Sequence, residues 1–348
     1  LHIPNYQLDW ELEREQPDNL ADPLTILIEA SNGASDYGNK FGEPVILGFV
    51  RSFDLRLSTG ERWGFIKPIM FTSGIGQIDA RLVEKHESEP GMLIVQIGGP
   101  AYRVGFGGGA ASSMLQGENV SDLDFNAVQR GDAEMEQKMN RVIRACCELG
   151  DDNPLEMIHD QGAGGPANVL KELVESAGGR IDIRAIRVGD PTMSVLEIYV
   201  AEYQERVGLL IAPGNLARFQ ALCRREKVTC EVLGEVTGDK RFIVTDSVTD
   251  TTPVDLELEP LLGGIPQKTF ADQRRTVSHE PLTIAPDAKV VDLLRRIFSL
   301  VSVGSKRFLT NKVDRAVTGL VAQQQCCGPL QLPVADFGVM AQTHFGTT

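Results

Sequence analysis

The chain has 348 residues, of which 42% are hydrophobic and 24% charged, and its formal net charge is -14 at pH 7. This length and composition predict a folded protein of two or more domains and exclude disorder over most of the chain. The negative charge argues against general binding to nucleic acid, because that binding depends mainly on Lys and Arg that neutralise phosphates. An anionic ligand must then be held locally, by backbone amides, a few basic residues or metal ions.

The six cysteines include two adjacent pairs and no C-x-x-C spacing. This pattern favours reduced, mostly buried thiols over a zinc site or a redox motif. No run of about 18 apolar residues occurs, so we expect no membrane-spanning helix. The first residues, LHIPNYQLDWELEREQ, lack the basic start and apolar centre of a signal peptide. A cytoplasmic protein is therefore expected.

Strand-like and helical patterns alternate along much of the chain, which predicts an α/β (α+β) fold. Residues 23–30 (PLTILIEA) and 43–57 are expected to be strands, with a turn-rich segment between them. Residues 92–99 (MLIVQIGG) read as a buried strand that leads into a ligand-binding loop.

The glycine-rich stretch GFGGGAASSM covers residues 105–114. Such a run favours either close approach of the backbone to a phosphate or a mobile surface loop, and the run alone does not decide between them. Gln129, Arg130 and Asp132 precede a predicted helix over residues 133–149, with Asp132 as its N-cap. Apolar residues recur along this helix at helical spacing, which places one of its faces in a core.

The next part of the chain repeats a strand and helix pattern. LEMIHD, residues 155–160, is predicted to be a strand, QGAGG a turn, and the segment from Pro166 a helix. The later predicted elements are a strand over residues 207–213, a helix over 214–227, a strand over 231–238, a linker over 246–286 and a helix over 289–301 that begins a new domain.

Asp160 closes a predicted strand and precedes a glycine turn and a helix start. Ligands of α/β sheets gather beyond the carboxyl ends of strands, and a carboxylate there suits Mg²⁺. Capping of the following helix by Asp160 is an equally good interpretation. If Asp160 faces a ligand, its strand neighbour His159 is expected to face the core.

Glu202 and Gln204 point to one side of an extended segment, if alternation holds over AEYQER. Two polar groups with a shared direction can orient a small substrate, although a solvated strand edge has the same pattern. Asp336 follows an apolar segment near the end of the chain, where it suits either a metal site or a surface turn.

Several long stretches together resemble one family, the large single-chain phosphoribosylformylglycinamidine synthases of purine biosynthesis. The resemblance runs from about residue 23 to residue 340. It is carried by EASNGASDYGNKFGEP, KPIMFTSGIG, GGPAYRVGFGGGAASSM, SDLDFNAVQRGDAEMEQKMNRVIRAC, HDQGAGG, NVLKEL, EIYVAEYQER, TPVDLELEPLLG and SKRFLTNKVDRAVTGLVAQQQCCGPLQLPVAD.

The resemblance implies a ligase that uses ATP to activate the amide oxygen of formylglycinamide ribonucleotide. Ammonia from glutamine then displaces phosphate to give the amidine. Phosphoryl transfer of this kind asks mainly for alignment and charge neutralisation, which glycine loops and Mg²⁺ supply. ATP and Mg²⁺ are the implied cofactors.

Site residues follow from the same resemblance. Leu47, Gly48 and Phe49 match a nucleotide-contacting stretch, and Ala335 matches a further adenine-nucleotide contact. The other implied roles are substrate contacts at Gln129, Glu202, Tyr203 and Gln204 and metal ligands at Asp160 and Asp336.

The family fold implied is a partial pseudo-dimer of units similar to aminoimidazole ribonucleotide synthetase. Residues 1–88 are expected to end a first ATP-binding half, 89–245 to form a complete C-terminal-type half, and 287–348 to begin a second ATP-binding repeat. The catalytic histidine motif, the main ATP loop and the glutaminase domain are not among the matching stretches. We therefore expect the chain alone to be inactive. The alternative is a noncatalytic remnant of the fold that binds nucleotide or a partner.

Overall fold

A computed structural model describes the chain over residues 20–42, 45, 47–73, 78–103, 131–162, 164–202, 205–264, 266–274, 281–300, 303–305, 307, 317–324, 326–333 and 337–341. Its helices are α1 (Pro23–Phe41), α4 (Ala133–Cys147), α5 (Gly165–Leu173), α6 (Val195–Val200), α7 (Leu216–Glu226), α8 (Leu258–Leu262) and α9 (Val290–Ser299). Its strands are β1 (Leu47–Arg56), β2 (Arg62–Ser73), β3 (Leu93–Gly98), β4 (Leu155–Asp160), β5 (Gly179–Asp182), β6 (Arg206–Ile211), β7 (Thr229–Val236), β8 (Arg241–Asp246), β9 (Thr251–Glu257), β10 (Val321–Gln323), β11 (Cys326–Cys327), β12 (Leu332–Pro333) and β13 (Val339–Met340).

Among the described residues, the largest sheet has seven strands in the order β4-β6-β3-β7-β5-β8-β9. All its strand pairs are antiparallel except β5 with β8, which is parallel. Strand β3 lies between β6 and β7 and is buried from Ile94 onward, as its unbroken apolar run predicts. The α/β class expected from the sequence is confirmed.

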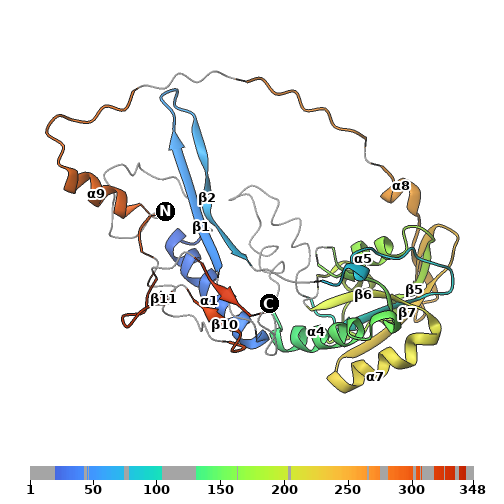
Figure 1. The fold of residues 1–348 in the computed structure, drawn as a ribbon. Coiled ribbons are helices and arrows are strands. Elements are labelled where there is room, and N and C mark those ends of the chain that lie inside the picture. The colour runs from blue at the N-terminus through green and yellow to red at the C-terminus, as the bar shows by residue number, and fades with distance from the viewer. Residues whose placement is uncertain are drawn as a thin grey trace.

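Helices cover both faces of this sheet (Figure 1). On one face α5 and α6 supply Val169, Leu170, Leu173 and Ile198 to a core that also contains Ile94. On the other face α4 and α7 pack Met139, Val142, Cys146, Phe219 and Cys223 against the strands. The predicted apolar stripe of α4 is confirmed, and so is its cap, because the Asp132 side chain accepts a hydrogen bond from the Met135 amide.

The strand predicted over residues 23–30, and the turn segment after it, are wrong, because both belong to the single helix α1. Asp22 caps the helix by accepting a hydrogen bond from the Leu24 amide at 2.8 Å, and Pro23 occupies a first-turn position. Gly42 ends the helix in the left-handed conformation, with φ of 99°. End signals thus outweigh the strand-like apolar content of residues 24–28.

Strands β1 and β2 form a separate antiparallel hairpin, which confirms the strand expected within residues 43–57. Several large apolar side chains of the hairpin are exposed, among them Phe53, Trp63 and Phe71. Helix α9 confirms the helix expected over residues 289–301, and it has no buried residue among those described.

Residues 251–262, expected in a linker, instead form β9 and α8, and β9 extends the large sheet beside β8. Pro253 lies in β9, which is an edge strand and therefore tolerates a residue without an amide hydrogen. Farther along, residues 266–274 form neither helix nor strand.

All six cysteines lie in the described part of the chain and are free thiols, as expected. Burial raises the pKa of Cys146 to about 12, so this thiol stays protonated at neutral pH. No helix in the described ranges is long and apolar enough to cross a membrane.

Candidate functional site at one end of the sheet

Three segments meet at one end of the seven-stranded sheet. Strand β3 ends at Gly98, which pairs with Arg206 at the start of β6. Strand β4 ends at Asp160, which pairs with Val207 on the other side of β6. The loop after β3, the glycine turn after β4 and the segment before β6 therefore emerge side by side, which is the arrangement expected for a ligand site.

Asp160 lies at the end of its strand, as predicted, and its side chain is 88% exposed. It does not cap α5, because the N-cap is Gly164 and no side chain bonds to that cap. The capping interpretation is therefore wrong. Asp160 offers its carboxylate to solvent at the mouth of the site.

Both ring nitrogens of His159 lie close to oxygen atoms. Nδ1 lies 2.7 Å from the Asp160 carbonyl oxygen, and Nε2 lies 2.9 Å from a carboxylate oxygen of Glu172 on α5. The side chain is mostly buried. These contacts give His159 a structural role between β4 and α5, in keeping with its expected orientation away from a ligand.

Glu202 is buried at the same end, next to the glycine turn. Its Oε1 accepts a hydrogen bond from the Gly164 amide at 3.2 Å. Gly165 has φ of 54°, and a Cβ there would come within 2.1 Å of the Ala201 carbonyl oxygen. Only glycine fits this close approach, so the QGAGG turn and the Glu202 segment are packed directly on each other.

A buried polar layer supports these segments. Gln96 in β3 donates to Gln161 in the glycine turn at 2.6 Å. The Arg206 guanidinium donates to the carbonyl oxygens of Gly99 and Arg187 and lies 3.7 Å from Glu231. Burial raises the pKa of Glu231, and Arg206 opposes that shift. The layer fixes the backbone at the end of the sheet.

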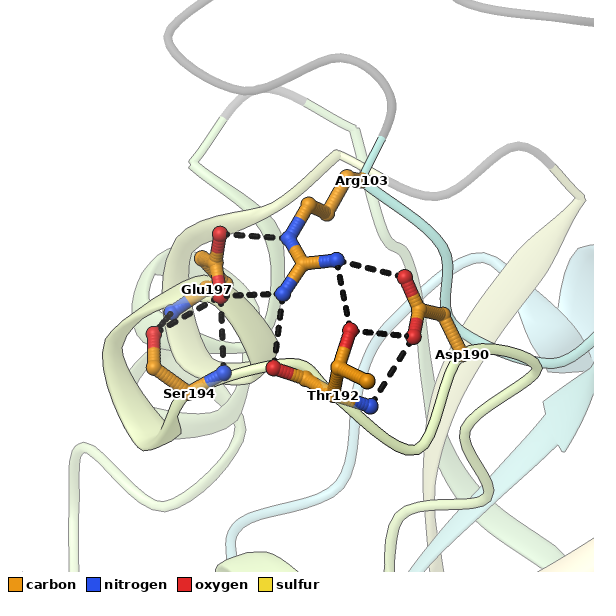
Figure 2. A network of polar contacts seen from close by, with 5 residues as sticks. All are labelled: Arg103, Asp190, Thr192, Ser194 and Glu197. Atoms are coloured by element: carbon orange, nitrogen blue, oxygen red, sulfur yellow. Dashed lines mark hydrogen bonds and ion pairs between the residues drawn. The ribbon is translucent and has the colours of Figure 1, made fainter.

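A network around Arg103 holds the chain immediately before the glycine-rich stretch (Figure 2). Arg103 donates to Asp190 at 2.5 Å, to Glu197 at 2.6 Å and to the Thr192 carbonyl oxygen at 2.6 Å. Ser194 and Glu197 form a capping box at the start of α6. The network therefore ties the segment after β3 to the N-terminus of α6.

These contacts shift the acidities of the network. The hydrogen bond from Arg103 lowers the pKa of Glu197 to about 2. Hydrogen bonds from Thr192, with the nearby Arg103 charge, lower the pKa of Asp190. Both carboxylates are therefore ionised at neutral pH and hold the guanidinium. Nothing in the local sequence indicated this network, because its members are 87 and 94 residues from Arg103.

Of the predicted nucleotide contacts, Leu47, Gly48 and Phe49 lie at the start of β1, in the hairpin and not in the large sheet. Gly48 pairs with Thr72, and a Cβ at Gly48 would come within 2.7 Å of the Phe71 carbonyl oxygen. The close pairing of β1 with β2 is therefore enough to explain why glycine occupies position 48.

Other predicted site residues lie outside the described ranges. These are Gln129, Tyr203, Gln204, Ala335 and Asp336, together with the stretch GFGGGAASSM. Among the described residues, no group of three or more His, Cys, Asp or Glu side chains could hold a metal ion. In the described part of the site, Asp160 precedes the glycine turn and Glu202 accepts a hydrogen bond from Gly164 in that turn.

Two family models match the chain. Residues 89–247 match "AIR synthase related protein, C-terminal domain", and residues 305–348 match "FGAR-AT PurM_N-like domain". The first match contains the whole of the candidate site and most of the large sheet.

Curated relatives match the chain over its full length. A probable chloroplastic/mitochondrial phosphoribosylformylglycinamidine synthase of Arabidopsis thaliana is 56% identical over 100% of this chain and 26% of its own length. The human phosphoribosylformylglycinamidine synthase is 53% identical over 99% of this chain and 27% of its own length. The chain thus spans about a quarter of the relatives it matches.

Solved structures share the fold. T. maritima PurL complexed with FGAR has a TM-score of 0.56 at 22% identity and covers 79% of this chain and 44% of that chain. T. maritima PurL complexed with ATP has a TM-score of 0.52 at 19% identity and covers 78% of this chain and 41% of that chain. From its identity to the plant and human synthases and its match to the family model, the chain belongs to the phosphoribosylformylglycinamidine synthase family.

Proposed function

We propose that the chain is the part of a phosphoribosylformylglycinamidine synthase that binds formylglycinamide ribonucleotide at the end of the seven-stranded sheet. The carrying observation is the convergence of the β3, β4 and β6 ends around the hydrogen bond between Gly164 and Glu202. The identity to the plant and human synthases supports the assignment, and a PurL of the same fold has been solved with FGAR.

In this proposal the substrate contacts are Gln129, Glu202, Tyr203 and Gln204. Glu202 contributes through a buried carboxylate that already orders the glycine turn. The turn leads into the N-terminus of α5, and the helix dipole there favours an anionic group such as the phosphate of the ribonucleotide. A turn that is already ordered before binding lowers the entropic cost of binding.

We further propose Asp160 as a ligand of Mg²⁺. Mg²⁺ commonly binds through one or two carboxylates together with water and substrate phosphates, so a single exposed carboxylate fits it. The ion would neutralise charge on the phosphates during phosphoryl transfer. Asp160 would supply one carboxylate oxygen as a ligand to the ion.

For ATP we propose contacts at Leu47, Gly48, Phe49 and Ala335, with Asp336 as a second magnesium ligand. ATP activates the amide oxygen, and ammonia derived from glutamine completes the amidine. The glutaminase domain and the rest of the synthetase are the partners in this proposal. The proposed domains are residues 1–88, 89–262 and 287–348, with β9 and α8 in the central domain because β9 extends its sheet and Leu258 joins its core. The enzyme is proposed to act in the cytoplasm and to bind neither nucleic acid nor a membrane.

Substitution of Asp160 tests the magnesium proposal. We expect Asp160→Asn to weaken binding of formylglycinamide ribonucleotide in the presence of Mg²⁺ about tenfold, because a charge-assisted contact is lost. Without Mg²⁺ the two proteins should bind alike. The matched control is Asp151→Asn, which removes a 93% exposed aspartate before the other end of β4. Equal magnesium-dependent affinities for wild type and Asp160→Asn would reject the role of Asp160.

An activity assay tests the expectation that this chain needs the rest of the enzyme. With ATP, the ribonucleotide and ammonium supplied, we expect no turnover above background. Turnover close to that of an intact synthase would contradict this expectation.

A noncatalytic role is the alternative, and exposed apolar side chains favour it. Trp63 of the hairpin and Val290 and Phe298 of α9 are all more than half exposed, and such surfaces commonly mark interfaces. Size-exclusion chromatography and a titration with Mg-ATP distinguish the two. A stable oligomer that binds no nucleotide supports the alternative.

A further inference from the structure

Glu205 has an unusual backbone conformation at the edge of the candidate site. Its φ is 55°, in the left-handed region, although it is not glycine, and its side chain is buried. Such a conformation is strained for a residue other than glycine and persists where the surroundings impose it. Here the Glu205 carbonyl oxygen accepts a hydrogen bond from the Gly99 amide. A Cβ at Gly98 would come within 2.1 Å of the same oxygen.

The side chain of Glu205 reaches a different part of the fold. The Tyr37 hydroxyl of α1 donates to Glu205 Oε1 at 2.9 Å, across 168 residues of sequence. Burial raises the pKa of Glu205, and the hydrogen bond from Tyr37 opposes that shift. The carboxylate thus receives a donor from α1, while its other oxygen, Oε2, is buried without a hydrogen-bond partner among the described residues.

Tyr37 is itself held against the chain that leads into α4. A Cβ at Gly131 would come within 2.8 Å of the Tyr37 ring, so glycine allows the ring to lie on the backbone there. A hydrogen bond between α1 and α4 runs from Gln137 Nε2 to the Phe41 carbonyl oxygen at 2.8 Å. Helix α1 is therefore fixed to the start of α4 beside Glu205.

Glu205 and Asp132 lie close in sequence to residues to which substrate binding is assigned. Glu202 precedes Glu205 by three residues, and Tyr203 and Gln204 lie between them in the chain. Gln129 precedes Asp132 by three residues. The hydrogen bond between Tyr37 and Glu205 thus joins the segment that contains Glu202 to α1.

We propose that Glu205 is a positioning residue that fixes the Glu202 segment relative to α1 and the start of α4, so that formylglycinamide ribonucleotide meets a preformed site. This inference rests on the proposed function, and it adds a residue and a helix to the site. The Tyr37 hydroxyl is a donor, so an accepting oxygen suits the position.

The test compares Tyr37→Phe, Glu205→Gln and the double variant in this chain. Two quantities are measured, the dissociation constant for formylglycinamide ribonucleotide and amide hydrogen exchange at Ala201, Glu202 and Glu205. We expect Tyr37→Phe to weaken binding about twofold to tenfold, which corresponds to the net value of one hydrogen bond. Exchange at the three amides should become faster, and the double variant should bind no more weakly than Glu205→Gln alone.

The matched control is Tyr199→Phe, which removes a hydroxyl from a mostly buried tyrosine on α6. A merely structural role for Tyr37 would lower the thermal midpoint and leave the affinity of the folded protein unchanged. If Tyr37→Phe matches Tyr199→Phe in both affinity and exchange, the inference is wrong.

The outcome also separates this inference from the proposed function. If the wild-type chain fails to bind the ribonucleotide, the proposed function fails. The exchange measurement then still decides whether Tyr37 orders the Glu202 segment. If the wild type binds and both variants bind equally well without a change in exchange, only the role of Glu205 is rejected.

Discussion

The large sheet and the β1–β2 hairpin contain similar apolar side chains and treat them differently. Strand β3 buries Ile94, Val95 and Ile97 between two helical layers. The hairpin leaves Trp63 and Phe71 more than half exposed. The comparison shows that helices of the same chain bury the apolar strands of the large sheet, whereas much of the apolar surface of the hairpin stays exposed.

The largest expected effect lies in the covered region. Phe219 of α7 is fully buried against the sheet. We expect Phe219→Ala to lower the free energy of unfolding of the sheet region by about 3–5 kcal/mol, through lost burial and the remaining cavity. Urea unfolding followed by circular dichroism, with hydrogen exchange of β3, measures the change. A loss below about 1 kcal/mol would show that the two regions do not differ as described.

A smaller effect on stability is expected from the Arg103 network, which lies beside the large sheet. Arg103 lowers the pKa of Glu197 to about 2, below the ordinary value of 4.5. A lowered pKa gives stability that is complete above about pH 4.5 and is lost as the pH falls towards about 2. Arg103→Met should therefore lower the thermal midpoint by a few degrees at pH 7.

The difference between wild type and Arg103→Met should shrink below pH 4.5. Lys85→Met, a substitution of an exposed cation, is the control and should show no such convergence. Parallel curves for wild type and Arg103→Met down to pH 3 would mean that the ion pair contributes no pH-dependent stability.

The smallest effect is expected on the hairpin. Trp63 is 57% exposed and pairs with Leu55. We expect Trp63→Ala to change the free energy of unfolding of this chain by about 0.5 kcal/mol or less, the usual range for surface positions. A loss above about 2 kcal/mol, in the same urea experiment, would erase the contrast between the regions.

The sequence predicted the large sheet better than its surroundings. The strands β3, β4, β6 and β7 and the helices α4, α5 and α7 follow from apolar periodicity, because these segments are buried by their own chain. Helix α1 was missed because few of its residues are buried, although Asp22, Pro23 and Gly42 carried its end signals. Strand β9 was missed because its residues are mostly exposed and include Pro253.

The candidate site was predictable where its residues are neighbours in the chain. Asp160 at a strand end and the glycine turn after it follow from local pattern, and the structure confirms that arrangement. The Arg103 network and the contact between Tyr37 and Glu205 could not be predicted, because both join segments that are distant in sequence. The left-handed conformation of Glu205 has no local signature, since that conformation usually selects glycine.

The position of β3 in the strand order also governs how the chain is made. Both neighbours of β3, β6 and β7, follow it by more than 100 residues. During synthesis on the ribosome, β3 therefore lacks both of its partner strands until residues 206–236 have emerged, and its apolar side chains stay uncovered by the sheet until then. Nascent chains that stop before residue 206 should bind holdase chaperones, and release should coincide with synthesis of β7.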